Sequence, residues 1–204
     1  MAASGFFLMT GPEDGFMAGA ELQYNDDGTL IVSDIRKFEP IGEEVTPQDI
    51  FPLQLQLGSA QQFPRFVHKY NRRCLRIYTD GACLNNGQSN PTAGWGVVFR
   101  QPEPNFPQME SISGRPENHG PSGEYHPQTN NRAELRAVIA ALQFRACFGE
   151  GFTKLVIATD SEYVTKGATE WIRTWGRNGW TTSSGKPVQK IGRASCRERV
   201  YGEC

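Results

Sequence analysis

Long apolar runs, paired cysteines and clustered histidines are all missing from this sequence of 204 residues. No stretch approaches the apolar length that crossing a bilayer requires, so no membrane-spanning helix is expected. The first residues lack a basic region followed by a long apolar core, so no secretory leader is expected. The five cysteines are odd in number and show no C-x-x-C spacing, which suggests neither a disulfide framework nor a zinc site. These features favour an intracellular protein, in the nucleus, cytoplasm or mitochondrion.

Charge is divided unevenly along the chain. Residues 1–60 hold ten acidic residues against Arg36 and Lys37, whereas residues 61–189 hold fifteen basic residues against ten acidic ones. A basic region that also carries clustered carboxylates suits a polyanionic substrate approached through metal ions. On charge alone, an ordinary solvated surface is the simpler interpretation.

The N-terminal region, residues 1–70, is predicted to be an acidic extension that is partly disordered, because it is rich in Gly, Asp, Glu and Pro. One hairpin is expected in it, with strands at 21–24 and 29–32 and turn residues between them. An isolated hairpin is marginally stable, so this region either lies against the next domain or is mobile.

Two acidic residues follow predicted strands. Alternation through residues 75–79 indicates a strand that ends at Asp80, and Gly81 then allows the backbone to turn away. The unbroken apolar run 155–158 fits a strand covered on both faces, and Asp160 comes just after it. In open α/β sheets, functional residues gather at the carboxyl ends of strands. Taken alone, Asp160 could equally be a helix N-cap.

The clearest helix in the sequence begins at Asn130 or Asn131, either of which is a good N-cap. Glu134 lies one position before its apolar stripe, and taken alone it would be a first-turn acid favoured by the helix dipole. Asp80, Glu134 and Asp160 thus lie on three rigid elements, and the three acids could converge on one point. The stripe consists of Leu135, Val138, Ile139 and Leu142.

Further elements surround these acids. A tight turn is expected at 85–87, a second strand at 93–99 whose glycines permit close backbone approach, and a third strand near 111–113. Trp171 and Trp175 are four residues apart and share a helix face, which is available either to the core or to a nucleic-acid backbone.

Four segments, in this order, resemble the signature of type 1 ribonuclease H: residues 79–83, 130–135, 159–164 and 171–180. The resemblance covers residues 72–189 and implies an α/β fold with a five-stranded mixed sheet flanked by helices. It also implies endonucleolytic hydrolysis of the RNA strand of RNA–DNA hybrids, with carboxylates holding two Mg²⁺ ions that Mn²⁺ can replace. The hybrid is the expected partner, no membrane or protein partner is indicated, and a monomer is expected.

Site residues carry over from this resemblance. Asp80, Glu134 and Asp160 are the implied catalytic residues, and the same three with Gly81 are the implied metal ligands. Acids this close repel one another without a cation, so some of their pKa values should be raised. The implied nucleic-acid contacts are Cys83, Asn85, Asn86, Thr129, Asn130, Asn131, Trp171, Trp175 and Ser183.

The resemblance stops before the family's last strand and helix, which carry a fourth catalytic aspartate. Residues 71–189 are therefore expected to form an incomplete ribonuclease H domain. Residues 190–204 are expected to be a non-native tail, because one reverse translation of 191–200 matches a common sequencing adapter. Without a last strand, 155–158 should be an exposed apolar edge.

Several functions stay open at this point. Hybrid cleavage is the leading hypothesis, and the alternatives are a module that binds hybrids without cutting them and an inactive truncated fragment. Another nuclease or an integrase of the same broad fold is disfavoured by the helix at 130–135 and by the Trp-rich segment at 171–180.

Overall fold

The computed structural model describes residues 5–10, 23–24, 30–31, 35–39, 46–55, 64–100, 102, 104, 110–120, 123–144, 147, 150–181, 185–186 and 188. For 5–10, 23–24, 30–31, 55 and 110 it describes the backbone alone. No helix among these residues is long and apolar enough to span a membrane. The tail predicted at 190–204 lies outside the described residues.

The described elements follow the chain from strands to helices. They are β1 (Gly5–Thr10), β2 (Gln23–Tyr24), β3 (Leu30–Ile31), β4 (Ile35–Lys37), α1 (Pro47–Ile50), β5 (Leu53–Leu55), β6 (Pro64–His68), β7 (Asn71–Leu84), β8 (Thr92–Arg100), β9 (Glu110–Gly114), α2 (Asn130–Phe144), β10 (Lys154–Thr159), α3 (Glu162–Lys166), the π-helix η1 (Gly167–Trp171) and α4 (Ile172–Arg177). The strands and the long helix predicted for the region after residue 70 are all present.

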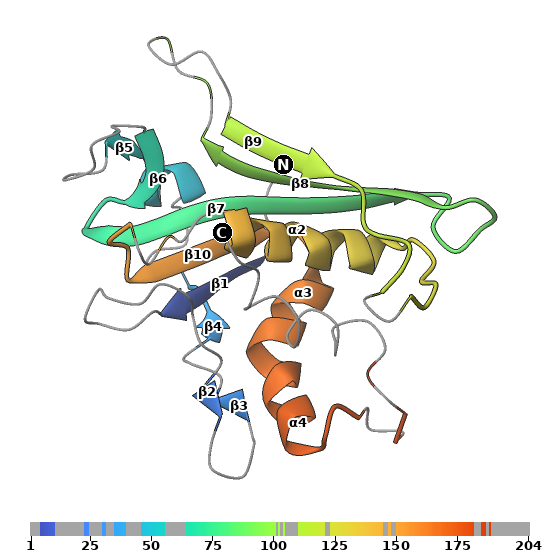
Figure 1. The fold of residues 1–204 in the computed structure, drawn as a ribbon. Helices are drawn as coiled ribbons and strands as arrows, with labels where there is room; N and C mark the ends of the chain where they lie inside the picture. The colour runs from blue at the N-terminus through green and yellow to red at the C-terminus, as the bar shows by residue number, and fades with distance from the viewer. Residues whose placement is uncertain are drawn as a thin grey trace.

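One mixed sheet of eight strands organises the described part of the chain (Figure 1). Its order is β4-β1-β10-β7-β6-β5, and β8 followed by β9 extends from β7. β7 and β10 run parallel, and the other strand pairs are antiparallel. The sheet is larger than the five strands expected because β1, β4, β5 and β6 join it. β2 and β3 form the predicted hairpin as a separate antiparallel pair. The predicted domain boundary at residue 70 stays a prediction.

The strand β10 is not a sheet edge. β1 pairs with it along its whole length, from Gly5 opposite Thr159 to Thr10 opposite Lys154, and β4 pairs with the other side of β1. The expectation of an exposed apolar edge at 155–158 is therefore wrong. A strand from far away in the sequence takes up the backbone hydrogen bonds of that edge, and edge pairing of this kind leaves no local pattern.

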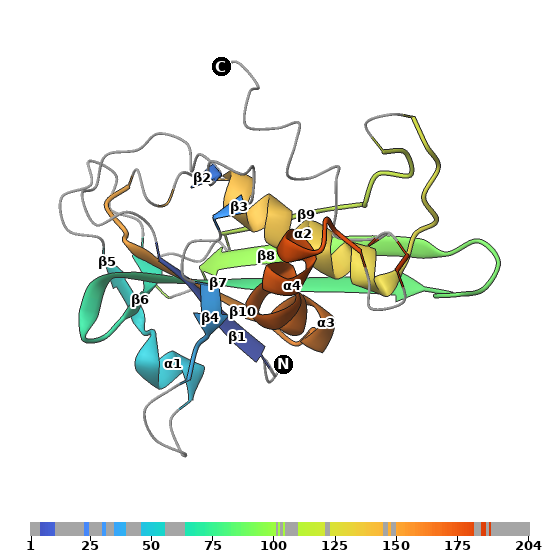
Figure 2. The ribbon, with the colours of Figure 1, turned by 90° about the horizontal axis from the view of Figure 1, so that it is seen from below.

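The two faces of the sheet are covered by different parts of the chain. On one face, Leu75 and Ile77 of β7 pack with Ala141 of α2. On the other face, Cys74 of β7 packs with Phe51, which follows α1. Figure 2 shows α1 and α2 on different sides of β7. The central strand is therefore buried on both faces, which holds its end rigidly in place.

The helix α2 contacts the sheet through small side chains. Its buried residues are Ala133, Glu134, Ala137, Ala140 and Ala141. The predicted apolar stripe is confirmed in part: Leu135 and Val138 are half-buried against the core, whereas Leu142 is 39% exposed. Alanines let a helix approach a strand closely, which favours this face over the bulkier one. As a result, Glu134 lies on the buried face of the helix.

The caps of α2 and α3 also differ from expectation. The Arg132 backbone N–H donates to Thr129 Oγ1 at 3.3 Å, so Thr129 rather than Asn130 or Asn131 caps α2. The Val164 backbone N–H donates to Ser161 Oγ at 3.3 Å, so Ser161 caps α3. Asp160 is therefore not the cap, and the capping interpretation of this acid is wrong.

Candidate metal and nucleic-acid site

Three carboxylates converge from three separate elements. Asp80 belongs to β7, Glu134 is the fifth residue of α2, and Asp160 follows β10; one oxygen from each lies within 4.8 Å of the others. β7 and β10 are parallel neighbours paired from Lys154 with Cys74 to Ala158 with Tyr78, and the same register continued places Asp160 beside Asp80. The structure thus brings together all three acids singled out in the sequence.

Gly81 makes this convergence possible. A Cβ at this position would lie 2.7 Å from the Cα of Glu134, so only glycine lets the first turn of α2 rest on β7. The Gly81 backbone N–H also donates to the Glu134 carboxylate. The close approach and the hydrogen bond both fix Glu134 next to Asp80. A role for Gly81 as a metal ligand stays a prediction.

Glu134 is the electrostatically strained member of the trio. Glu134 is only 4% exposed to solvent. Burial, followed by the charges of Asp160 and Asp80, raises its pKa to about 7, and the hydrogen bond from Gly81 offsets part of that rise. A raised pKa in this cluster was expected from the sequence. The carboxyl therefore holds its proton to near neutral pH when no cation is near.

The trio fits a divalent metal ion. Glu134 Oε2 is buried and has no hydrogen-bond partner, although buried polar atoms nearly always have one. Carboxylate oxygens are the hard ligands that such ions prefer, and a cation among these oxygens would relieve both the repulsion and the missing contact.

The first group of predicted nucleic-acid contacts joins the tip of the β7–β8 hairpin to the start of α2 (Figure 1). The Cys83 backbone N–H donates to Asn130 Oδ1 at 3.1 Å, and the Asn130 backbone N–H donates to Asn86 Oδ1 at 3.2 Å. Asn85 stands in the turn with a φ of +54°, which asparagine tolerates well. Asn131 is the second residue of α2 and is partly exposed. These residues form one continuous polar surface.

The second group is part of a row of aromatic rings. The ring centroids of Trp171 and Trp175 are 5.6 Å apart, and the row continues to Tyr163 at 5.6 Å and to Trp180 at 6.5 Å. Sequence reasoning missed Tyr163, although its separation of eight residues from Trp171 fits the same helix face. Ser183 lies outside the described residues.

Side chains that the sequence did not single out hold the loop before α2. Gln128 accepts from the Ala93 backbone N–H at 2.6 Å and donates to Asn118 Oδ1 at 2.8 Å. Arg132 donates to the Pro127 carbonyl at 3.0 Å. Such bonds between distant residues carry no periodic signal in the sequence. They fix the loop between β9 and α2 beside the site.

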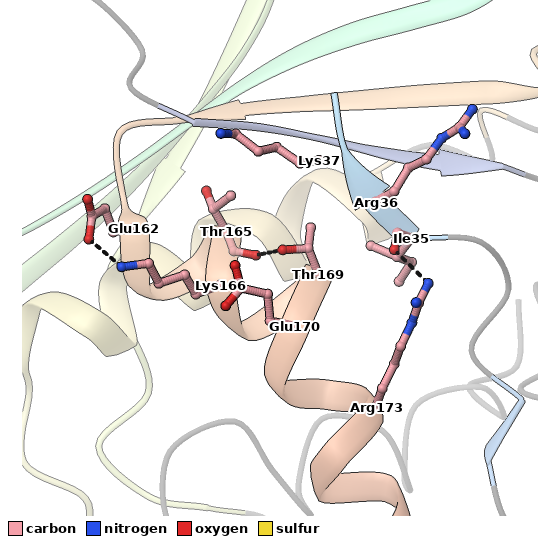
Figure 3. A pocket seen from close by; sticks show the side chains of 9 residues that line it. All are labelled: Ile35, Arg36, Lys37, Glu162, Thr165, Lys166, Thr169, Glu170 and Arg173. Carbon is pink, nitrogen blue, oxygen red and sulfur yellow. Dashed lines mark hydrogen bonds and ion pairs between the residues drawn. The ribbon is translucent and has the colours of Figure 1, made fainter. Parts of the chain in front are cut away.

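Two hollows lie near these elements. One, of about 540 Å³, opens on the face of β7, β8 and β9 and includes Asp80. The other, of about 350 Å³, lies between β4 and the helical segment α3–η1 (Figure 3). In the second hollow Lys166 pairs with Glu162 at 3.0 Å, and Arg173 donates to the Ile35 carbonyl at 3.3 Å. The Arg173 contact joins β4 to the helices, so we interpret the second hollow as a packing seam.

Known proteins resemble this chain over the part that carries the site. The RNase H family model matches residues 72–200. A Ribonuclease H of Cyanothece sp. is 43% identical over 118 residues, which cover 58% of this chain and 64% of that protein. A Ribonuclease H of Treponema pallidum subsp. pallidum is 44% identical over 117 residues, covering 56% and 65%. Ribonuclease H1 of Rattus norvegicus is 34% identical over 165 residues, covering 75% of this chain and 49% of that protein.

This chain spans just under two thirds of the length of the two bacterial relatives. The family model nevertheless covers more than half of the chain, including every element that carries an acid of the trio. The α/β fold with a mixed sheet and a helix packed on β7 agrees with the fold expected from the sequence. The chain therefore belongs to the RNase H family.

Proposed function

We propose that this protein hydrolyses the RNA strand of RNA–DNA hybrids endonucleolytically, by a two-metal-ion mechanism. The observation that carries the proposal is the convergence of Asp80, Glu134 and Asp160 within 4.8 Å from three rigid elements. Asp160 does not cap α3, and structure alone gives no reason to bury Glu134 against two like charges. Membership of the RNase H family supports the choice of reaction.

The three carboxylates would hold the metal ions, which we propose to be two Mg²⁺ ions, with Mn²⁺ as a possible substitute. Bound there, such ions stabilise the attacking and leaving oxygens of an in-line displacement at phosphorus. Asp80 supplies oxygens from within β7 and Asp160 from just past the end of β10, and Glu134 supplies its unpartnered Oε2 from the helix.

The chain's own contribution is positioning. Gly81 orients the Glu134 carboxylate through its backbone N–H, and the strands β7 and β10 hold Asp80 and Asp160 at the same level of the sheet. Ligands fixed before the reaction need no rearrangement in the transition state, which lowers the barrier. Protons and metal ions would compete for the Glu134 carboxylate, so activity should fall on the acid side, and the fall should move to lower pH as Mg²⁺ is raised.

Recognition of the hybrid is assigned to the two surfaces beside the carboxylates. The polar surface of Cys83, Asn86 and Asn130 is suited to the minor groove, where 2′-hydroxyl groups distinguish RNA from DNA. The aromatic row that contains Trp171 and Trp175 is suited to the DNA strand, because aromatic rings contact nucleotides without sequence preference.

A substrate panel tests the proposal. Labelled RNA–DNA hybrid, RNA duplex and DNA duplex of one sequence are incubated with the protein in Mg²⁺ and in EDTA. Cleavage of the RNA strand of the hybrid alone, and in Mg²⁺ alone, is the expected result. Binding without cleavage would instead identify a hybrid-binding module, and equal cleavage of the RNA duplex would refute the substrate assignment.

An intracellular location and a monomeric state belong to the same proposal. The odd number of cysteines and the lack of C-x-x-C spacing are the reasons for proposing a reducing compartment. Light scattering on the purified chain tests the oligomeric state, and a tagged chain imaged in cells tests the location.

A further inference from the structure

We propose that the hollow beside Asp80 receives the sugar–phosphate backbone of the substrate, and that Arg115 binds a phosphate there. The inference rests on the proposed action on RNA–DNA hybrids and adds a binding residue that the resemblance does not supply. The hollow has a volume of about 540 Å³ and lies on the face of β7, β8 and β9. Arg115 is the only cationic residue among the described residues that line it.

Arg115 lies close to the strand row that contains Asp80. Asp80 lies opposite Gly96, and Gly96 lies opposite Ser113, which forms one row across the three strands. Arg115 comes two residues after Ser113, just past the end of β9, and it lines the same hollow as Asp80. From strand spacing and rise, its Cα lies about 12 Å from that of Asp80. Arg115 would therefore bind a phosphate that flanks the reacting one.

The floor of the hollow is made of two glycines that the fold does not require. Neither Gly94 nor Gly96 has a positive φ. A Cβ on Gly96 would meet nothing within 4 Å, and one on Gly94 would meet only the Gly114 carbonyl at 3.8 Å. Glycine inside a strand weakens it, and such positions often mark a close approach by a ligand or another backbone. We infer that the open floor serves a molecule lying on the sheet.

The backbone on both sides of Arg115 is fixed, while its side chain is exposed. Gly114 lies against the Trp95 ring, where a Cβ would stand 2.7 Å from a ring carbon. Pro116 is buried, and its carbonyl accepts from Gln128 Nε2 at 3.2 Å. A cation on a fixed backbone costs little entropy when it binds a phosphate. It also offsets the repulsion between the substrate and the three carboxylates.

Hybrid binding in EDTA, measured by fluorescence anisotropy with the full 204-residue chain, separates this inference from the catalytic one. Gly96→Val should keep the thermal midpoint, since valine suits a strand and its Cβ would meet nothing within 4 Å, and it should weaken hybrid binding several-fold. Arg115→Ala should weaken binding about three- to tenfold and make the slope of log K against log salt shallower by about one. Arg115→Lys should restore most of the loss.

The matched control is Arg73→Ala, because Arg73 is an exposed arginine near the opposite end of β7 from Asp80. It should leave both affinity and salt slope unchanged. If the unmodified chain binds hybrid but Gly96→Val and Arg115→Ala bind equally well, the inference fails and the proposed function survives. If Arg73→Ala lowers the slope as much as Arg115→Ala, the effect is general surface charge and the inference also fails. If the unmodified chain binds no hybrid, both this inference and the proposed function fail.

Discussion

The backbones of Gly81 and Glu134 are in direct contact, so a glycine on the strand fixes the position of a carboxylate on the helix. A Cβ on Gly81 would stand 2.7 Å from the Glu134 Cα, and the Gly81 N–H donates to the Glu134 carboxylate. Because Asp80 precedes Gly81, this contact sets the separation of two of the three acids. The metal site therefore depends on a residue without a side chain.

Gly81→Ala should separate α2 from β7. Overpacking of this kind typically costs about 1–3 kcal/mol, and displacement of Glu134 should weaken metal binding as well. Urea unfolding and calorimetric titration with Mg²⁺ measure the two effects. Gly96→Ala is the matched control, since its Cβ meets nothing within 4 Å and stability should be kept. Equal stability of Gly81→Ala and the unmodified protein would contradict the packing argument.

The raised pKa of Glu134 predicts that Glu134→Gln increases the free energy of unfolding in a pH-dependent way. In the folded protein this pKa is raised to about 7, so the folded state favours the protonated carboxyl. Below the ordinary pKa of glutamate the carboxyl is protonated in both the folded and the unfolded state, so the free energy of unfolding is not reduced. As pH rises toward 7 the unfolded state ionises first, and stability falls by at most about 3 kcal/mol.

In EDTA, Glu134→Gln should therefore be more stable than the unmodified protein at about pH 8 but not at about pH 4. Urea unfolding at the two pH values measures this difference. Mg²⁺ should reverse the order at the higher pH by stabilising only the protein that keeps the carboxylate. An equal effect of the substitution at both pH values would rule out the proposed raised pKa.

Local signals in the sequence were sufficient to single out the three acids that the structure brings together. Asp160 follows an apolar strand pattern as predicted, but the prediction that a strand ends at Asp80 is wrong, because β7 continues to Leu84 by pairing with β8. The sequence predicts the helix that carries Glu134 correctly, but it predicts this residue beside the buried face, whereas the structure has it on that face. Leucine and valine mark a helix face by hydrophobicity, whereas the alanines that pack on β7 are chosen for size. Hydrophobic periodicity alone does not distinguish these two criteria.

Strand pairings between distant segments could not be predicted from the sequence. β1 lies beside β10 although about 150 residues separate them, and nothing local to either segment encodes its partner. Arg76 shows the same limit, because alternation with Leu75 and Ile77 indicates an outward, solvated side chain. A second core that includes Ile50, Phe51 and Phe66 covers that face, so Arg76 is fully buried.

Burial of Arg76 predicts an unusual response to mutation. Its guanidinium carbon lies 5.1, 4.8 and 4.4 Å from the ring centroids of Phe51, Phe66 and Tyr78, and it donates to the Pro47 carbonyl. Its Nε and Nη2 atoms have no hydrogen-bond partner, and burial lowers its pKa to about 10. Cation–π contacts contribute about 2 kcal/mol, less than the several kcal/mol that desolvating the charge costs.

Arg76→Met should therefore keep or raise the free energy of unfolding, because methionine fills the space without a buried charge. Arg76→Ala should lower it by about 3 kcal/mol by leaving a cavity. Urea unfolding of both variants provides the comparison. If Met were as damaging as Ala, the cation–π contacts would outweigh the desolvation cost.

The aromatic row predicts a loss of binding that is separable from catalysis. Trp175 contacts both Trp171 and Trp180, and it is partly exposed. Trp175→Ala should weaken hybrid binding about tenfold, because stacking on an aromatic ring contributes roughly 1–3 kcal/mol. Trp175→Phe keeps a ring and should retain most of the affinity. Fluorescence anisotropy measures both, and unchanged binding by the alanine variant would assign the row to packing alone.

The most direct test of the central claim is cleavage of a labelled RNA–DNA hybrid by the chain and by its Asp80→Asn variant over a range of Mg²⁺ concentrations. This substitution keeps the shape of the side chain but removes one charge from the trio. We expect the unmodified chain to cut the RNA strand only when Mg²⁺ is present, and the variant to bind hybrid without cutting it. Cleavage by the variant at the same rate, or cleavage in EDTA, would contradict a metal site built from Asp80, Glu134 and Asp160.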